Sequence, residues 1–465
     1  MEHSLARSFI QADTSGTTTL AELMSAFSYA LDLTEGQPDG HSIRSCWIAS
    51  RLAAMIGLDD TQRRTIYYST MLKDLGCSSN AARIAETYLT DDRNFKHDFK
   101  LVGRGLVPVL SFVFTKTGVG LPIGRRAKVI ARILSNGEEI ARSLIATRCT
   151  QGAQVARLLR FPEAVAQAIA ALDEHWDGSG KPLRLKGDEI PLASRFALLA
   201  QIAEVFYTHA GPQAARAEVA RHRGRWFDPA LCDAFAAMTA ESAFWAELGE
   251  RDIEQRNLAL EPETLAVTVD ENYLDDIASA FGQVIDAKSP YTAGHSARVS
   301  QYCEAVSRKV GIAPENIGTL RRAAALHDVG KLGVSSAVLE KPGKLDAAEW
   351  EVMRRHASHT TAILSRISPF REMAMISGSH HERLDGKGYP LGLSATMIAR
   401  ETRIITVCDF FDALTADRPY REAMAAEQAF SIMAEEVGRA IDSDVFEALK
   451  TVVADGRPAN SLSAA

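Results

Sequence analysis

The chain has 465 residues, of which 46% are hydrophobic and 24% charged, and its formal net charge is −7. This length exceeds one compact core, so two or three domains are expected. The negative net charge argues against a protein that binds nucleic acid non-specifically or that lies on an anionic membrane surface. We therefore expect neither DNA nor membrane as a partner. A small anionic substrate remains compatible, because local basic residues can hold such a molecule whatever the total charge.

The sequence has the features of a soluble cytoplasmic protein. Its opening segment, MEHSLARSFIQADTSG, contains no apolar stretch of the kind found in secretory signals. The apolar run from Leu106 to Phe114 contains Pro108 and is far shorter than the ~20 residues of a membrane span. The six cysteines form no CxxC pair, which favours buried free thiols in a reducing compartment over a disulfide framework.

The predicted elements are helices throughout. Near the start, apolar residues recur at i, i+3, i+4 and i+7 from Leu20 to Leu31, which predicts one buried helix face. The same spacing returns from Leu274 to Ile285. The alternation typical of strands is hard to find, so the predicted fold class is all-α.

The two halves of the chain predict the same fold twice. DGHSIRS around His41 matches AGHSARV around His295, and LKDLG matches LHDVG at the same offset of 254 residues. DEHWDGSGKP, ending at Pro182, matches HERLDGKGYP, ending at Pro390, at an offset of 208. Helices share periodicity but not rare tripeptides in a fixed order, so the pattern indicates an internal duplication. We expect two tandem helical bundles.

The change of offset places 46 extra residues in the first copy, between Cys77 and about Leu172. This insertion contains RGLVPVLSFVFTKTGVGLPIGRR, whose glycines and prolines predict a loop with a short buried element and no chemistry.

The domain limits follow from the duplication and from composition. We expect a first domain at residues 19–246, a charged connecting helix and linker at 247–270, and a second domain at 271–453. The terminal segments 1–18 and 454–465 are small and polar and are expected to be loosely ordered.

The second half gathers histidines and aspartates in apolar surroundings. An aspartate between buried neighbours is costly unless it is paired or coordinated. Imidazole nitrogen and carboxylate oxygen together suit divalent transition metals such as manganese, iron or zinc. The candidate ligands are His295, His327, Asp328, His356, His380, His381 and Asp409. Seven ligands exceed the need of one ion, so two metal ions are expected, and adjacent pairs on a helix would point about 100° apart. His359 is expected to lie behind a ligand or on the surface.

From about Asp286 to Leu449 the chain resembles the HD-GYP family of bacterial phosphodiesterases, which cleave cyclic di-GMP. The stretches that carry the resemblance are SPYTAGHSARV, AALHDVGKLGV, LEKPGKL, HHERLDGKGYP and VCDFFDALTADRPYR. The resemblance implies the seven ligands above and two ions of iron or manganese. Some members hold a third metal with a glutamate one turn before the first histidine, where this chain has Tyr291. A two-metal centre is therefore favoured, and an efficient second cleavage is left open.

Further positions of the family pattern concern the substrate. Lys331, Arg418 and Arg421 are expected to bind phosphate oxygens. The GYP loop ends in a glycine and proline turn, and its Tyr389 can stack on a base or dock diguanylate cyclase (GGDEF) proteins. For catalysis, Asp328 is expected to bridge the metals and accept the proton of the attacking water, and Lys331 to stabilise the equatorial phosphoryl oxygens.

The leading functional hypothesis is hydrolysis of cyclic di-GMP to pGpG, with GMP as the product of a second cleavage. A second hypothesis keeps the chemistry but changes the substrate, to cyclic GMP-AMP or another nucleotide. A third hypothesis is a signalling adaptor that binds cyclic di-GMP with little turnover, and a homodimer remains open.

The first copy has lost most of the ligand set. His41 and Asp74 correspond to His295 and Asp328, and the region of His356 aligns near Cys149. The other ligand positions are occupied by Lys73, Leu172, Asp173 and Gln201, and the GYP position reads Gly180–Lys181–Pro182. We therefore expect a partner without metal that packs on the active copy or regulates it, with a nucleotide in its old cleft as the weaker alternative.

Overall fold

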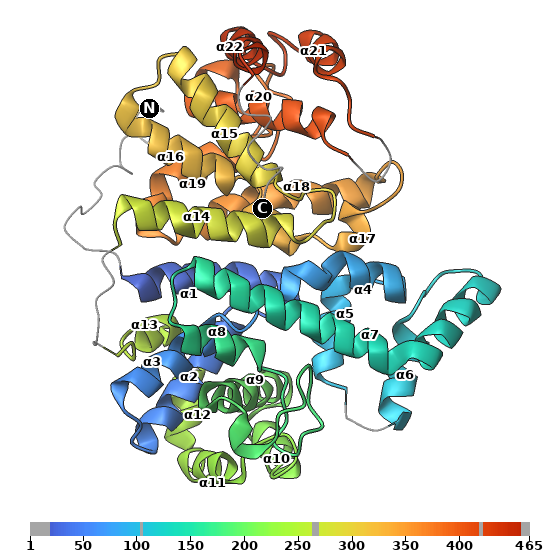
Figure 1. Cartoon of the computed structure of the whole chain (residues 1–465), viewed down its shortest axis with the longest axis vertical. Helices are drawn as coiled ribbons and strands as arrows, with labels where there is room; N and C mark the ends of the chain where they lie inside the picture. Colours follow the sequence, from blue (N-terminus) through green and yellow to red (C-terminus); the bar gives the residue numbers. More distant parts are fainter. Residues whose placement is uncertain (1–18, 103–105, 263–268, 418–421, 457–465) are drawn as a thin grey trace, which may run out of the picture.

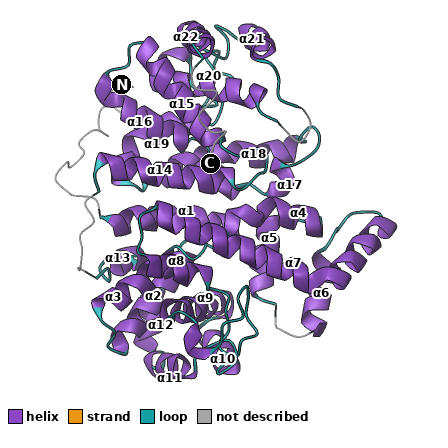
Figure 2. Ribbon diagram, in the orientation of Figure 1, coloured by secondary structure: helices purple, strands orange, loops and turns teal. Residues whose placement is uncertain are grey.

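A computed structural model describes residues 19–102, 106–262, 269–417 and 422–456. Every regular element among these residues is a helix, which confirms the all-α prediction (Figure 2). Figure 1 shows the chain as two stacked lobes, the first copy below and the second above.

The first copy contains thirteen α-helices and two short 3₁₀ helices among the described residues. They are α1 (Leu20–Glu35), α2 (His41–Met55), α3 (Asp60–Met71), η1 (Cys77–Asn80), α4 (Ala81–Tyr88), α5 (Asp92–Lys100), α6 (Leu106–Lys116), α7 (Ile123–Leu158), α8 (Glu163–Ala170), η2 (Gly187–Glu189), α9 (Leu192–Ala210), α10 (Pro212–Arg221), α11 (Pro229–Met238), α12 (Ser242–Leu248) and α13 (Ile253–Leu258).

The second copy has nine α-helices and three 3₁₀ helices in the described part of the chain. They are α14 (Glu271–Asp286), α15 (His295–Lys309), α16 (Pro314–Ala325), η3 (Val329–Gly333), α17 (Ser336–Leu339), α18 (Ala347–Ser365), η4 (Ser368–Phe370), α19 (Arg371–Gly378), η5 (Ala395–Met397), α20 (Arg400–Thr415), α21 (Ala426–Ala434) and α22 (Ser443–Ala454).

The duplication is visible in the helix ends themselves. Helices α2 and α15, like α3 and α16, begin and end at positions that differ by 254, and α8 and α19 differ by 208 at both ends. Gly40 and Gly294 precede α2 and α15 with φ of 82° and 70°, a left-handed conformation that favours glycine. The turn therefore places a histidine at the first residue of each helix.

The two copies pack against each other reciprocally. Helix α1 lies on η3 and α18 of the second copy, while α14 lies on η1 and α7 of the first. At the centre the fully buried rings of Phe27 and Phe281 stack with their centroids 3.6 Å apart. The apolar core runs through this contact without a break. The halves are therefore joined by a core and not by a wet interface.

Lys288 is a buried cation at this contact. It follows α14, and its Nζ donates a hydrogen bond of 2.7 Å to the carbonyl of Leu332 in η3. Burial lowers the pKa of Lys288 to about 7, although Asp92 of the first copy opposes the shift. Because an unfolded lysine titrates near 10.4, only the unfolded chain holds this proton between about pH 7 and pH 10.

Lys288→Met should remove a pH dependence of stability. Between about pH 7 and pH 10 the unfolded state binds more protons, so wild-type stability should rise with pH, by up to about 1.4 kcal/mol per unit. The variant should lack this rise in urea unfolding measured at several pH values. Lys309→Met, at a half-exposed lysine, is the matched control and should follow the wild type. Parallel profiles for wild type and Lys288→Met would contradict the prediction.

The insertion differs from its prediction. The stretch expected to be a loop with a short buried element forms α6 and the start of α7, a helix of 36 residues. Pro108 lies in the first turn of α6, where the missing N–H costs no intrahelical hydrogen bond. Phe112 and Val113 of α6 are buried against the neighbouring helices. The proline therefore lies in the first turn of a helix and does not interrupt it.

The remaining predictions concern the connection, the thiols and the membrane. The segment expected as a connecting helix and linker includes α13, which packs on α2. All six cysteines are free and buried, as predicted. Among the described helices, none combines the length and apolar character that crossing a bilayer requires. The terminal segments were predicted at 1–18 and 454–465, and residues 1–18 and 457–465 lie outside the described residues, whereas Ala454 ends α22.

Candidate active site

The seven predicted ligands converge in the second copy. His295 opens α15, His356 lies in α18 and Asp409 lies in α20. The adjacent pairs were expected to lie on helices. Instead, His327–Asp328 and His380–His381 occupy the turns that follow α16 and α19. Gly330 explains the first turn, because it packs so closely on the carbonyl of His356 that any side chain would collide. A tight 3₁₀ turn replaces the helix there.

The ligand atoms form two neighbouring groups. His295, His327 and Asp409 make one group, and His356, His380 and His381 make the other, each with its atoms within 4.8 Å of one another. Asp328 lies between them. Its Oδ2 is 3.6 Å from His295 Nε2 and 3.3 Å from His327 Nε2. Its Oδ1 is 3.6 Å from His356 Nε2 and 3.7 Å from His380 Nε2. One carboxylate thus faces both groups.

Hydrogen bonds behind the rings orient their free nitrogens. The Nδ1 atoms of His327, His356 and His380 donate to backbone carbonyls at 2.6–2.7 Å. Their Nε2 atoms, together with His295 Nε2 and Asp328 Oδ1, are buried and have no hydrogen-bond partner among the described residues. Buried polar atoms are normally satisfied. A divalent cation at each group would satisfy them, so the donor set fits two ions.

The electrostatics differ between the two groups. Burial lowers the pKa of His356 to about 3 and that of His381 to about 4, so both imidazoles are neutral at pH 7 and can coordinate. Burial acts in the same direction on His327, but the carboxylates of Asp328 and Asp409 outweigh it and raise the pKa to about 9. The group formed by His295, His327 and Asp409 therefore favours a bound cation.

Asp412 is a functional residue that the sequence analysis missed. Its Oδ2 accepts a hydrogen bond of 2.7 Å from Nδ1 of His295, and its Oδ1 accepts one of 2.6 Å from Arg298 Nε. It lies three residues after Asp409 on α20, so both carboxylates share one helix face. That spacing in DFFD was a signal that could have found it.

Asp412→Asn should weaken metal binding by about 10- to 100-fold while the fold persists, because the carboxylate orients His295 and raises its basicity. A chelator competition titration measures this loss. Glu204→Gln is the matched control, since Glu204 holds His41 and Arg44 of the first copy in the same way. Equal affinity in the wild type and Asp412→Asn, or equal loss in both variants, would refute the role of Asp412.

The structure describes two of the four residues that are predicted to bind substrate. Lys331 Nζ donates a hydrogen bond of 2.5 Å to Asp328 Oδ2, and its side chain is partly exposed. The Tyr389 ring packs on the His381 ring with centroids 4.8 Å apart. Both side chains therefore border the cluster. Arg418 and Arg421 lie outside the described residues. The partly exposed Asp409 and His381 leave the cluster open to solvent.

Two residues near the cluster do not join it. His359 is half-buried beneath Gly333, at the contact between the copies. Tyr291, at the position where some HD-GYP proteins have a glutamate, is half-exposed. Neither side chain belongs to the ligand groups found among the described residues.

The GYP loop is held by a buried carboxylate. Glu382 accepts hydrogen bonds from the backbone N–H groups of Leu391, Gly392 and Leu393 at 2.6–3.1 Å. Gly388 passes so close to the backbone of His381 that a side chain would not fit. The loop is therefore fixed to the same turn that carries two of the candidate ligands.

The first copy repeats this framework without most of the ligands. Gly76 packs on the carbonyl of Arg148 as Gly330 packs on that of His356. The counterpart of His356 is therefore Arg148, the residue before Cys149. Among the described residues of this copy, the only candidate ligand group is Glu35, Asp74 and Cys77. Three lysines (Lys73, Lys96 and Lys100) lie beside these carboxylates and supply the positive charge.

Comparisons with known proteins agree with this geometry. A family model described as "HD domain" matches residues 132–231 and 280–445. The 3′3′-cGAMP-specific phosphodiesterase 3 of Vibrio cholerae serotype O1 is 48% identical over 93% of this chain and 94% of its own length. The crystal structure of a cyclic GMP-AMP specific phosphodiesterase in V. cholerae (V-cGAP3) matches with a TM-score of 0.65 and 43% identity, over 94% of this chain and 98% of that one.

A more distant relative has a related name. The cyclic di-GMP phosphodiesterase response regulator RpfG of Xanthomonas campestris pv. campestris is 36% identical over 42% of this chain and 53% of its own length. The match to the V. cholerae protein extends over both copies, whereas this one covers less than half of the chain. The chain belongs to the HD-domain family, among the HD-GYP type phosphodiesterases that hydrolyse cyclic dinucleotides.

Proposed function

We propose that this enzyme hydrolyses 3′3′-cyclic GMP-AMP to a linear dinucleotide at a centre of two divalent metal ions, iron or manganese. The observation that carries the metal centre is the set of orphaned Nε2 atoms around Asp328. Its ligands are His295, His327, Asp328, His356, His380, His381 and Asp409. When bound, the ions would supply Lewis acidity and an activated water.

Three side chains of this chain supply the other functions that hydrolysis requires. Asp328 faces both ligand groups, so it would help to hold both ions, and its carboxylate can take the proton of the attacking water. Lys331, bonded to Asp328 and partly exposed, neutralises charge that develops on the phosphoryl oxygens. Tyr389 presents an aromatic face beside His381, on which a base can stack.

The choice of substrate rests on the relatives. The protein that matches over both copies is named for 3′3′-cGAMP, and two further V. cholerae relatives with that name are 34% identical over 50% and 44% of this chain. Cyclic di-GMP is the second candidate, because two relatives that match 42% and 38% of this chain are named for it. A low-turnover adaptor is the third candidate, favoured by the degenerate first copy.

Further parts of the proposal concern the cell. We place the enzyme in the cytoplasm, where cyclic dinucleotides act as second messengers. The GYP loop, with Tyr389 at its centre, is a surface on which a diguanylate cyclase can dock. A homodimer is compatible with this arrangement.

A substrate panel tests the proposal. Purified protein loaded with manganese or iron is assayed with 3′3′-cyclic GMP-AMP, cyclic di-GMP and cyclic di-AMP. We expect kcat/KM for 3′3′-cyclic GMP-AMP to exceed that for cyclic di-GMP by about tenfold or more, a difference of about 1.4 kcal/mol in transition-state binding. Faster cleavage of cyclic di-GMP would assign the second candidate. Tight binding without product would assign the adaptor.

A further inference from the structure

The first copy carries fixed cations where the second copy has candidate metal ligands. Lys73 stands at the position of His327, is fully buried, and donates a hydrogen bond to the adjacent Asp74. Arg148 stands at the position of His356 and pairs with Asp173. The protein itself therefore supplies the positive charge of this cleft, and an anion can be attracted there without any metal.

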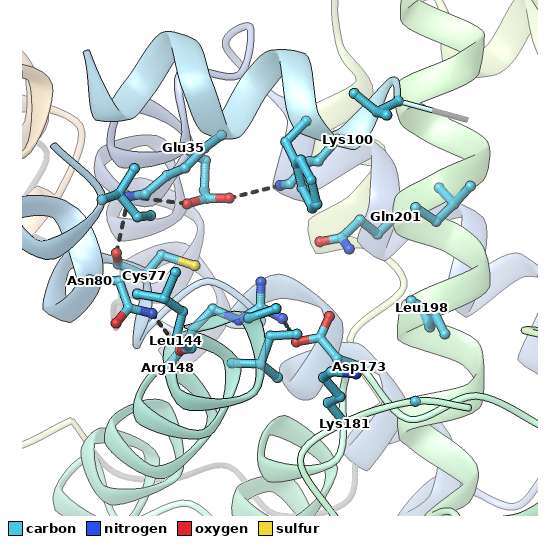
Figure 3. Close-up of a pocket in the computed structure, with 18 of the residues that line it drawn as sticks. Glu35, Cys77, Asn80, Lys100, Leu144, Arg148, Asp173, Lys181, Leu198 and Gln201 are labelled. Carbon is cyan, nitrogen blue, oxygen red and sulfur yellow. Dashed lines mark hydrogen bonds and ion pairs between the residues drawn. The ribbon is translucent and has the colours of Figure 1, made fainter. Parts of the chain in front are cut away.

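A cavity of about 650 Å³ lies at this cleft, and Arg148, but not Lys73, is among the residues that line it (Figure 3). Helix α9 forms one wall, and the opposite wall comes from α4, α5, α6 and α7 of the insertion. This second wall is apolar and aromatic, with Ile84, Tyr88, Phe95, Phe99, Leu144 and Ile145 among its residues. The volume lies within the range of pockets that hold small molecules. The insertion thus turns an inherited polar cleft into an amphipathic pocket.

The polar end of the cavity holds groups with incomplete bonding. Lys100 Nζ forms an ion pair of 3.0 Å with Glu35 Oε2, and its N–H donors have no hydrogen-bond partner among the described residues. Gln201, which replaces Asp409, leaves its Oε1 buried without a donor in the described part of the chain. Figure 3 shows both side chains directed into the cavity. Buried donors normally have an acceptor, so the N–H groups of Lys100 point to an acceptor on a ligand.

The charges limit what that ligand is. Four cationic side chains and two acidic ones line the cavity, so an incoming anion is attracted. Arg148 pairs with Asp173. Lys96 is shared between Glu35 and Asp92, and Lys100 also pairs with Glu35. Few uncommitted cations remain for a dinucleotide with two phosphates. A small head group with a sizeable apolar body matches the pocket better.

We propose that the first copy binds an amphipathic organic anion, such as a medium-chain carboxylate. Its head group lies beside Lys100 and Arg148, and its apolar body lies against the aromatic wall of the insertion. Burial of its methylene groups against this wall gives such a ligand a large hydrophobic driving force.

Helix α5 of this wall also contacts the catalytic copy. Phe95 and Lys100 of α5 line the cavity, while Arg93 of this helix donates a hydrogen bond of 2.5 Å to the carbonyl of Gly333. Asp92 of α5 accepts a hydrogen bond of 2.7 Å from the backbone N–H of Ser336. Gly333 lies two residues after Lys331 and five residues after Asp328. Occupancy of the cavity is therefore expected to change turnover, a consequence that rests on the proposed function.

Calorimetry with sodium decanoate and the full-length, metal-loaded protein tests the site. We expect saturable binding at one site per chain. Lys100→Gln should weaken it by about tenfold, since it removes the head-group cation but leaves Glu35 paired with Lys96. Ala141→Trp should abolish binding by filling the cavity. Lys116→Gln, at a lysine of α6 outside the cavity lining, is the matched control and should bind like the wild type.

Several results would overturn the site: no saturable binding, equal binding of decyltrimethylammonium, or unchanged binding by Ala141→Trp. Displacement of decanoate by 3′3′-cyclic GMP-AMP in a variant with an inactive second copy would assign the cavity to a nucleotide instead. Decanoate should also change the initial hydrolysis rate at least twofold in the wild type and not in Ala141→Trp. Binding without a rate change would overturn the coupling. Absence of all hydrolysis would contradict the proposed function and leave the calorimetric result standing.

Discussion

Replacing His327–Asp328 with Ala–Ala should lower kcat/KM by about 10³-fold or more and leave the helical content unchanged. Asp328 faces both ligand groups, and His327 points its free Nε2 at the carboxylates, so the variant removes atoms from both metal positions at once. A 10³-fold loss is about 4 kcal/mol of transition-state stabilisation, the scale expected when metal-ion catalysis is lost. Initial rates with a cyclic dinucleotide and circular dichroism measure the two effects.

The first copy offers a matched control for this change. Lys73–Asp74→Ala–Ala alters the corresponding pair, which is a buried ion pair. Removing both partners leaves no uncompensated charge, so the fold should survive. This variant should retain hydrolysis within a few-fold of the wild type. Activity retained by the second-copy variant, or lost equally in both, would show that the chemistry lies elsewhere.

Phe27→Ala should destabilise the whole chain. The Phe27 ring stacks on Phe281 at an interplanar angle of 11° and also meets Phe370 edge-on. All three rings are fully buried, so truncation leaves a cavity at the centre of the contact between the copies. Deletions of this kind cost about 3–5 kcal/mol. Urea unfolding followed by fluorescence and by circular dichroism should show this loss.

Phe114→Ala is the comparison for this variant, because Phe114 is half-exposed on α6. Its effect should stay within about 0.5 kcal/mol, as for most surface changes. A loss below about 1 kcal/mol in Phe27→Ala would mean that the two copies associate loosely, and that the shared core contributes little.

Local patterns were sufficient to predict the fold class and the duplication. The helical spacing that starts at Leu20 and Leu274 reports burial of one face, which depends only on nearby residues. The repeated glycine before His41 and His295 fixes where a helix begins, and the structure places both starts at an offset of 254. Helix ends can be predicted when the turn residues that produce them are in the sequence.

The ligand set was also accessible, because its residue types are rare in apolar surroundings. The sequence did not reveal how the adjacent pairs are placed. His327–Asp328 leaves the helix because Gly330 must pass the backbone of His356, a contact between segments far apart in the chain. Asp412 was overlooked for the same reason, since its importance depends on its bond to His295.

The structure of the insertion includes features that local sequence patterns do not predict. Pro108 and the nearby glycines predict a break, but a proline in the first turn is compatible with α6. The cavity beside Lys100 forms only when α5 and α7 pack opposite α9. The periodicity of residues in the sequence does not predict a cavity between packed helices.

The metal content of crystals grown with manganese tests the central claim most directly. Anomalous diffraction should show two peaks per chain in the second copy, one among His295, His327 and Asp409 and one among His356, His380 and His381, with Asp328 between them. The cleft around Lys73 and Asp74 in the first copy should show none. Peaks at the first copy, or an empty second copy, would contradict the assignment of this cluster as the catalytic metal centre.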